Sequence, residues 1–310
     1  MNVEDVNRIL IIGAGHMGRE IGFQCAYHGY DVVLHDADAA ILESLPADLK
    51  TLVEPYVRAD LLDGERVQAA LSRLSTEADP AAAAAGADLV SESVPEDPKL
   101  KGRVFSNFHD LCPAHTIFTT NTSTLVPSQF ARATGRPAQF AAFHFHTPVW
   151  VSNVVDVMPH PDTAPETVSL LEAFAHRIGQ IPIVLHKEHH GYVFNSLLNV
   201  LLGEAMTLVE QGVANPEDVD RAWMGVMRTE IGPFGIIDLV GLDTVWKITD
   251  YWAGRLFWRR QLRRNANYLK ARLEEGRHGR DSGRGFYNYP NPAFEQPGFV
   301  PGRGSETGDA

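Results

Sequence analysis

The sequence predicts an α/β domain, a parallel sheet with helices on both faces, followed by an all-α domain. Short apolar runs alternate with helical stretches over the first 185 or so residues, which is typical of a parallel sheet covered on both faces. From Gly191 onward, long helical stretches replace this alternation. The length of 310 residues also fits about two domains. We therefore expect domains at 1–188 and 189–290, with 291–310, rich in Pro, Gly and acidic residues, as a mobile tail.

The strands of the first domain are predicted from short apolar runs. Residues 8–12 are too few and too β-branched for a buried helix. The other expected strands are 31–36, 88–90, 116–119, 140–143, 153–158 and 181–185. Helices are expected between them at 39–45, 47–61, 98–110 and 164–177, and the alanine run 81–85 predicts one or two helical turns.

The second domain is predicted to be helical apart from its last segment. Helical patterns cover 192–211, 216–228, 241–252 and 257–274. A strand pattern returns only at 286–289.

Composition excludes several classes of partner. The 27 basic and 39 acidic residues give a net charge of -12, which repels nucleic acid. Two cysteines, Cys25 and Cys112, are too few for a disulfide framework and favour a reducing, cytoplasmic location. The N-terminus does not resemble a signal peptide, and no apolar run approaches the roughly 18 residues of a membrane span, so no membrane partner is expected.

A dinucleotide site is predicted where the first strand meets the first helix. Residues 13–18 read Gly-Ala-Gly-His-Met-Gly, and an acid, Asp36, ends the next strand. The glycines permit a tight turn, close approach of a pyrophosphate and close helix packing, while the carboxylate accepts bonds from a ribose and repels a 2′-phosphate. NAD is therefore the expected cofactor; the alternative is a turn that binds nothing. The expected contacts are Gly13, Gly15, His16, Met17, Gly18 and Asp36.

Further motifs resemble those of one family. They read Asn-Thr-Ser at 121–123, His-Phe-His-Thr-Pro at 144–148, Val-Asp-Val at 155–157, Gly-Tyr-Val-Phe-Asn at 191–195, Gly-Pro-Phe at 232–234, Asp-Leu-Val-Gly-Leu-Asp at 238–243 and Gly-Arg-Gly-Phe-Tyr at 283–287. Their order and spacing are similar to those of the L-3-hydroxyacyl-CoA dehydrogenases, over residues 8 to about 290. The resemblance implies a Rossmann domain, a helical domain that forms a homodimer, and NAD-linked oxidation of a 3-hydroxyl group.

The resemblance assigns His144 as the general base, a role that suits an imidazole whose pKa lies near the working pH. The family places a glutamate twelve residues later, where this sequence has Asp156, a side chain shorter by about 1.5 Å. We expect a functional pair, through closer backbone approach, a bridging water or a weaker contact; the alternative is that Asp156 caps a strand end. Ser123 and Asn195 resemble the neutral residues that bind the reacting oxygen and the substrate. The alternative for Asn195 is a bond between helices.

The resemblance places Glu96 and Lys101 near the nicotinamide ribose and carboxamide, and Asn121 at a third cofactor contact. The alternative for Lys101 is an exposed charge pair on a helix. His146 and Thr147 depart from the family's Phe and Asn, and we expect His146 to face away from His144 and to be structural. No metal is expected, because the cluster His186, His189 and His190 has no Cys or acid at ligand spacing.

The substrate is predicted less directly. Residues 37–80, which correspond to the stretch that carries CoA-binding lysines in the family, sum to -5, whereas 255–284 sum to +7. Residues 94–97, 159–168 and 178–180 also resemble the branch of L-gulonate 3-dehydrogenase and lambda-crystallin. We favour a short-chain L-3-hydroxyacyl thioester as the small-molecule substrate. A free 3-hydroxy acid such as L-gulonate, and a non-catalytic NAD-binding protein, remain the alternatives.

Overall fold

The computed structural model describes residues 1–255 and 259–301, and the chain divides into two compact units, Met1–Val193 and Phe194–Ala310. The first unit runs past the expected boundary at residue 188. The reason is packing: Tyr192 is buried in a cluster with Ala142, Met158 and Leu185 of the sheet unit.

The first unit is built on an eight-stranded sheet with the order β3-β2-β1-β4-β5-β6-β7-β8. Every neighbouring pair is parallel except β6 and β7, which are antiparallel. The expectation of a parallel sheet is therefore confirmed for most of it and wrong at this pair. The strands are β1 Arg8–Ile12, β2 Asp31–His35, β3 Leu74–Thr76, β4 Leu89–Glu92, β5 Ile117–Thr120, β6 Phe140–Phe145, β7 Val154–Pro159 and β8 Ile181–Val184.

The short edge strand β3 escaped the sequence analysis, since its three residues carry little apolar pattern. The other strands lie within two residues of their expected ends. They present nearly continuous apolar runs, as strands buried on both faces do.

Six helices cover the sheet unit: α1 His16–Tyr27, α2 Ala39–Arg58, α3 Gly64–Ser72, α4 Pro80–Ala84, α5 Pro98–Leu111 and α6 Pro165–Arg177. The two helices expected at 39–45 and 47–61 are one helix, α2, with Pro46 inside it. A buried stripe of Leu42, Leu45, Leu49 and Val53 continues past the proline, so packing outweighs the missing N–H donor.

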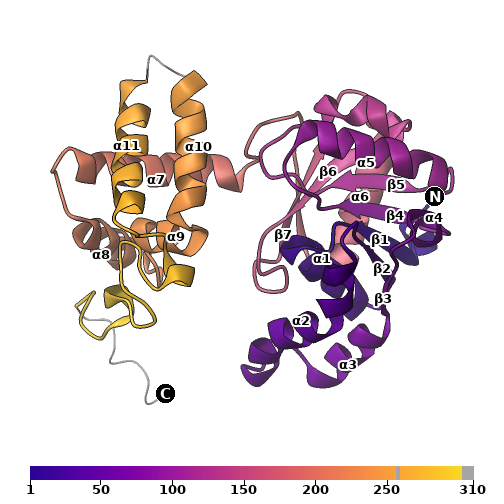
Figure 1. Cartoon of the computed structure of the whole chain (residues 1–310), viewed down its shortest axis with the longest axis horizontal. Helices are drawn as coiled ribbons and strands as arrows, with labels where there is room; N and C mark the ends of the chain where they lie inside the picture. The colour runs from indigo at the N-terminus through magenta and orange to yellow at the C-terminus, as the bar shows by residue number, and fades with distance from the viewer. Residues whose placement is uncertain (256–258, 302–310) are drawn as a thin grey trace. The chain divides into compact units, whose positions relative to one another are not determined.

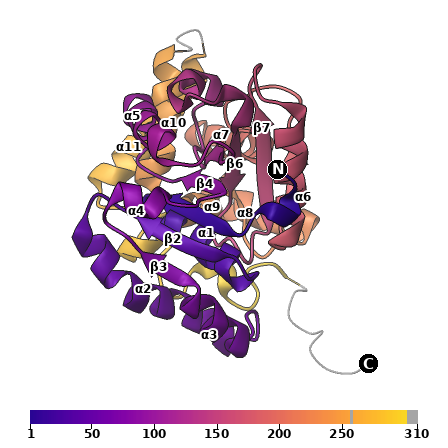
Figure 2. The same cartoon turned by 90° about the vertical axis from the view of Figure 1, so that its right-hand side faces the viewer.

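The two faces of the sheet have separate apolar cores. One contains Ile9, Ile11 and Leu34 with residues of α1, α2, α3 and α6, and the other contains Leu10, Ile12 and Val90 with residues of α4 and α5. Alternate residues of β1 thus enter opposite cores, as the period of two requires. In Figure 1, α5 lies over the strands at one face, and Figure 2 shows α2 and α3 beyond the β3 edge.

The second unit is helical, with α7 Phe194–Glu210, α8 Pro216–Met227, α9 Pro233–Val240, α10 Leu242–Arg255 and α11 Arg260–Glu274. Helix α9 was not expected. The start of the helix expected at 257–274 falls on residues outside the described ranges. Helices α10 and α11 pack side by side (Figure 1).

The strand expected at 286–289 is wrong. Arg284 forms only isolated bridges, to Gly279 and Asn288. The Asp238 carboxylate instead accepts the backbone N–H groups of Phe286 and Tyr287 at 2.7 and 2.8 Å. A side chain of α9 thereby satisfies the donors that a strand would pair.

The prediction of a mobile tail over residues 291–310 is wrong for its first part. Phe294 and Phe299 are buried in the apolar core of the helical unit, so the chain is packed as far as Val300. The remainder, 302–310, lies outside the described residues. Within the described ranges, no helix combines the length and apolar character needed to cross a membrane.

Candidate active site

The glycine turn between β1 and α1 has the geometry of a phosphate cradle. Gly13 has a φ of +97°, and a Cβ there would lie 2.8 Å from the backbone of Ser93. A Cβ on Gly18 would lie 1.9 Å from the carbonyl oxygen of Gly13, whereas one on Gly15 would meet nothing within 4 Å. Two glycines therefore make the turn possible, and the third leaves space beside the helix N-terminus. The space, the free N–H groups and the positive end of the helix dipole fit a dinucleotide pyrophosphate.

Asp36 follows β2 and is held against this turn. Its Oδ2 accepts the N–H of Ala14 at 2.8 Å, and its Oδ1 accepts the N–H of Asp38 at 3.0 Å. The partly exposed carboxylate keeps further lone pairs for ribose hydroxyls. The geometry thus fits the role expected for it.

His16 and Met17, the other residues expected at the turn, have different surroundings. His16 is exposed, with Nε2 3.2 Å from both Thr147 Oγ1 and Glu20 Oε1. Met17 is half-buried and packs against the apolar core. Glu20 is buried and accepts the Thr147 hydroxyl and the Val149 N–H, both at 3.1 Å, so it ties α1 to the loop after β6.

His144 and Asp156 face each other across the antiparallel pair β6–β7. The Nδ1 of His144 lies 3.1 Å from Asp156 Oδ2, and the two side chains are 6% and 1% exposed. Because Cβ atoms of directly opposed residues lie about 5 Å apart, a short carboxylate reaches the ring without a water. Since the carboxylate only accepts, Nδ1 carries the proton and Nε2 is left as the basic nitrogen.

His146 is placed wrongly by the sequence analysis. It lies just beyond the end of β6, and its Nε2 is 3.1 Å from the same Asp156 Oδ2. The expectation of opposite faces is in error, because residues i and i+2 of a strand share a face. Both imidazoles therefore meet one carboxylate oxygen.

These three residues form the cluster, within the described ranges, whose ligand-type atoms all lie within 4.8 Å of one another. The two N–O distances of 3.1 Å are ordinary hydrogen-bond lengths, and both end on a single oxygen. That is the pattern of a shared acceptor rather than of ligands spread around an ion. The expectation that the protein binds no metal stays a prediction.

The electrostatics of the pair suit proton transfer. Burial lowers the pKa of His144 and outweighs the hydrogen bond to Asp156, which raises it. Burial also raises the pKa of Asp156, but the hydrogen bonds from His144 and His146 outweigh it and leave the pKa below its ordinary value. At neutral pH the site thus holds a neutral imidazole beside an ionised carboxylate.

Tyr192 covers the face of the His144 ring. The rings are stacked, with centroids 4.5 Å apart and planes 12° from parallel. The Tyr192 hydroxyl donates to the carbonyl of Thr122 at 2.6 Å, and the residue has a φ of +51°. A bulky residue in the left-handed region is costly and is found where the surroundings fix it, often at active sites.

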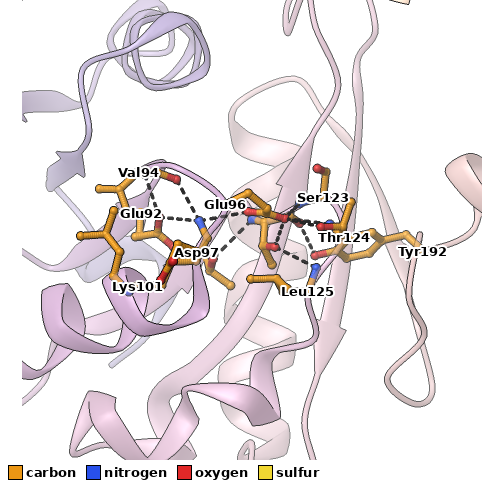
Figure 3. Close-up of polar contacts among 12 residues, drawn as sticks. Glu92, Val94, Glu96, Asp97, Lys101, Ser123, Thr124, Leu125 and Tyr192 are labelled. Carbon is orange, nitrogen blue, oxygen red and sulfur yellow. Dashed lines mark hydrogen bonds and ion pairs between the residues drawn. The ribbon is translucent and has the colours of Figure 1, made fainter. Parts of the chain in front are cut away.

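A buried ion pair supports the loop that carries Ser123. The Nζ of Lys101 lies 2.7 Å from Glu92 Oε1 and 3.3 Å from Glu96 Oε2, and the Lys101 and Glu92 side chains are at most 1% exposed. Glu96 Oε1 accepts the N–H groups of Ser123 and Thr124 at 3.1 and 2.9 Å. Figure 3 shows Lys101 between the two glutamates and Glu96 directed at the loop. The alternative of an exposed pair for Lys101 is therefore wrong.

The remaining expected residues are placed as follows. The Asn121 side chain accepts the N–H of Phe145 at 2.8 Å, which links its loop to the end of β6. Ser123 is half-buried beside Glu96. Asn195 lies in the first turn of α7 and belongs to the helical unit, and its role stays a prediction.

The sequence analysis missed the structural roles of Glu20, Glu92 and Tyr192. It expected His146 to be structural but placed it on the wrong face. Two features of the sequence could have helped. Glu92 is an acid inside an apolar strand, and the period of two along a strand puts residues 144 and 146 on the same face. No local pattern indicates that Tyr192 stacks on a residue 48 positions away.

Comparison with known proteins gives consistent matches over nearly the whole chain. Residues 8–189 match the family model described as 3-hydroxyacyl-CoA dehydrogenase, NAD binding domain, and residues 191–289 match the C-terminal domain of the same name. The human mitochondrial hydroxyacyl-coenzyme A dehydrogenase is 34% identical, over 92% of this chain and 91% of its own. A probable 3-hydroxybutyryl-CoA dehydrogenase of Bacillus subtilis is 32% identical, over 92% and 98%.

Solved structures also match the chain over most of its length. A diketoreductase that acts on dicarbonyl compounds matches with a TM-score of 0.84 and 38% identity, over 92% of this chain and 99% of its own. The (S)-3-hydroxybutyryl-CoA dehydrogenase of Ralstonia eutropha matches with a TM-score of 0.82 and 27% identity, over 93% and 100%.

Proposed function

The chain belongs to the 3-hydroxyacyl-CoA dehydrogenase family, and from this premise we propose that it catalyses the reversible, NAD-dependent oxidation of a short-chain L-3-hydroxyacyl-CoA to the 3-oxoacyl-CoA. The observation that carries the proposal is the neutral His144, paired at Nδ1 with Asp156. Oxidation of a carbinol removes a hydride from carbon and a proton from oxygen. NAD, when bound, accepts the hydride.

His144 and the residues around it supply proton removal, charge stabilisation and cofactor binding. His144 Nε2 takes the proton of the substrate hydroxyl, and Asp156 stabilises the imidazolium that forms. Ser123 offers a neutral hydroxyl to the reacting oxygen, which stabilises developing negative charge without competing for the proton. Gly13, Gly15 and Asp36 hold the dinucleotide.

One assay separates this function from its alternatives. Purified protein is expected to oxidise NADH with acetoacetyl-CoA. Reduction of NAD with L-gulonate or 3-hydroxybutyrate, and no rate with the CoA ester, would contradict the thioester assignment. Intact NADH binding with no rate on any substrate would indicate a non-catalytic protein.

A free hydroxy acid or small dicarbonyl compound is the second candidate. The net charge of -5 over residues 37–80 offers little attraction to a CoA phosphate, and the diketoreductase, at 38% identity, acts on dicarbonyl compounds. A diketone should therefore be tested beside acetoacetyl-CoA. A higher kcat/KM for the diketone would favour this candidate.

We also propose a homodimer formed through the helical unit. Side chains of α7 and α8 within that unit are strongly exposed although apolar, including Leu197 at 69%, Val200 at 72% and Val226 at 80%. Such surfaces are typical of interfaces. Light scattering is expected to give twice the 34.2 kDa of the chain, and Val226→Glu to reduce it.

For location, we propose a reducing compartment such as the cytoplasm. Cys25 and Cys112 are both free and buried. Fractionation of cells that express the tagged protein would test this placement, since the human relative is named as mitochondrial.

A further inference from the structure

We propose that His146 is a positioning residue for the base: two imidazoles, His144 and His146, share one oxygen of Asp156, and the second holds the carboxylate in the geometry that the first requires. The inference rests on the proposed function of His144. It goes beyond that function by assigning a role to a residue that the family resemblance leaves without one.

The geometry of the Asp156 carboxylate supports this role. Asp156 is 1% exposed, so water cannot replace a lost partner, and Oδ2 receives both ring nitrogens at 3.1 Å. An aspartate that lacked the second contact could turn about its terminal bond and carry Oδ2 away from His144. Two donors on one oxygen fix that rotation.

The types of the two residues fit this role. The Asp156 side chain is short and has few ways to reach the His144 ring, and His146 supplies a second anchor for it. A residue present only for packing would not need a nitrogen 3.1 Å from that oxygen.

Ring contacts enclose the base from two sides. The His146 ring lies edge-on to His144, with centroids 4.7 Å apart and planes at 77°, while Tyr192 stacks on the ring at 4.5 Å. The His144 ring is therefore located by the edge of one ring, the face of another and a carboxylate.

The charges around His144 predict how this arrangement affects the base. The charged or titratable groups that act on its pKa are Asp156 from β7, His146 after β6 and Glu96 from the loop before α5, and the Tyr192 ring lies stacked on it. A carboxylate that already accepts an N–H from His146 attracts a second proton donor less strongly. His146 therefore keeps His144 in the neutral form that accepts the substrate proton.

Two variants test the proposal in the full-length enzyme. His146→Phe removes the donor, and we expect kcat to fall about tenfold and the acid limb of kcat/KM for oxidation to move to higher pH. His146→Gln keeps an N–H donor and is expected to recover most of kcat and the original acid limb. Kd for NADH and the Tm report whether each variant keeps an intact fold.

The proposal fails if His146→Phe keeps the kcat and acid limb of the unmutated enzyme, or if His146→Gln loses as much as His146→Phe. If both variants unfold, ¹⁵N NMR of the ring nitrogens of the unmutated protein decides. The proposal requires a proton on His146 Nε2 near neutral pH, and a proton on Nδ1 alone would overturn it. An unmutated enzyme without turnover would instead contradict the proposed function, a separate result.

Discussion

Asp156 lies directly opposite His144 in the register of β6 and β7, and this register allows the shorter carboxylate to contact the imidazole at 3.1 Å. The sequence analysis left three possibilities for this pair: closer backbone, a bridging water or a weaker contact. An antiparallel neighbour brings the two backbones together, which corresponds to the first possibility.

Replacement of the base should separate chemistry from cofactor binding. We expect His144→Gln to lower kcat by about 10³-fold, because the proton acceptor is lost. The glycine turn and Asp36 are untouched, so Kd for NADH, measured by fluorescence, should stay within about twofold. Parallel losses in kcat and NADH affinity would show that His144 is structural.

The pH dependence should follow the lowered pKa of His144. Oxidation requires the unprotonated ring, so kcat/KM for the hydroxyacyl substrate should be level above the ordinary value of 6.5 and fall only at lower pH. Reduction requires the imidazolium, so kcat/KM for the oxo substrate should rise as the pH falls through the same range. An acid limb for oxidation above pH 6.5 would contradict the burial of the ring.

The stacked tyrosine should contribute through its ring and its hydroxyl separately. Tyr192→Phe keeps the stacking on His144 and removes the bond to the Thr122 carbonyl, so kcat is expected to fall only a few-fold. Tyr192→Leu removes both and should lower kcat by about tenfold or more. Equal effects of the two variants would indicate that the hydroxyl, not the ring, matters.

Cofactor choice should depend on the charge of Asp36. Asp36→Asn keeps an oxygen that can accept the Ala14 N–H and removes the charge, so we expect the preference for NAD over NADP to weaken at an intact turn. Asp36→Ala removes both the charge and the acceptor and should also lower the affinity for NAD itself. The ratio of kcat/KM for the two cofactors checks this, and an unchanged ratio in Asp36→Asn would contradict it.

The buried ion pair should appear in the free energy of unfolding. Lys101→Met leaves Glu92 buried without its cation, and we expect a loss of about 3–5 kcal/mol in denaturant titrations. Adding Glu92→Gln neutralises the site and should recover most of that loss. A single variant as stable as the unmutated protein would show that the pair is unimportant.

Much of the fold could be predicted from sequence because local signals and tertiary packing agree. The strands β1, β2 and β6 are short apolar runs, and the glycine turn needs its glycines for steric reasons that sequence alone reveals. Local sequence signals gave wrong predictions where contacts with residues distant in the sequence determine the structure. Pro46 is held inside α2 by a buried stripe, and the segment after Arg284 is held by the Asp238 carboxylate rather than by a strand.

The residue types of the candidate site could be predicted from the sequence, but the contacts between those residues could not. The sequence gives no register for β6 and β7, so the sharing of Asp156 by two histidines appears only in three dimensions. The burial of Lys101 depends on Glu92, a strand residue that no motif contains.

The hairpin of β6 and β7 keeps the residues that transfer the proton close together in the sequence. Base, orienting acid and second histidine all lie between residues 140 and 159, so one continuous piece of chain carries the whole proton-handling apparatus. Such short sequence separation makes these contacts among the least costly to close during folding. A recombination event that exchanged this hairpin would transfer a matched His–Asp–His set intact, whereas a point mutation would break it.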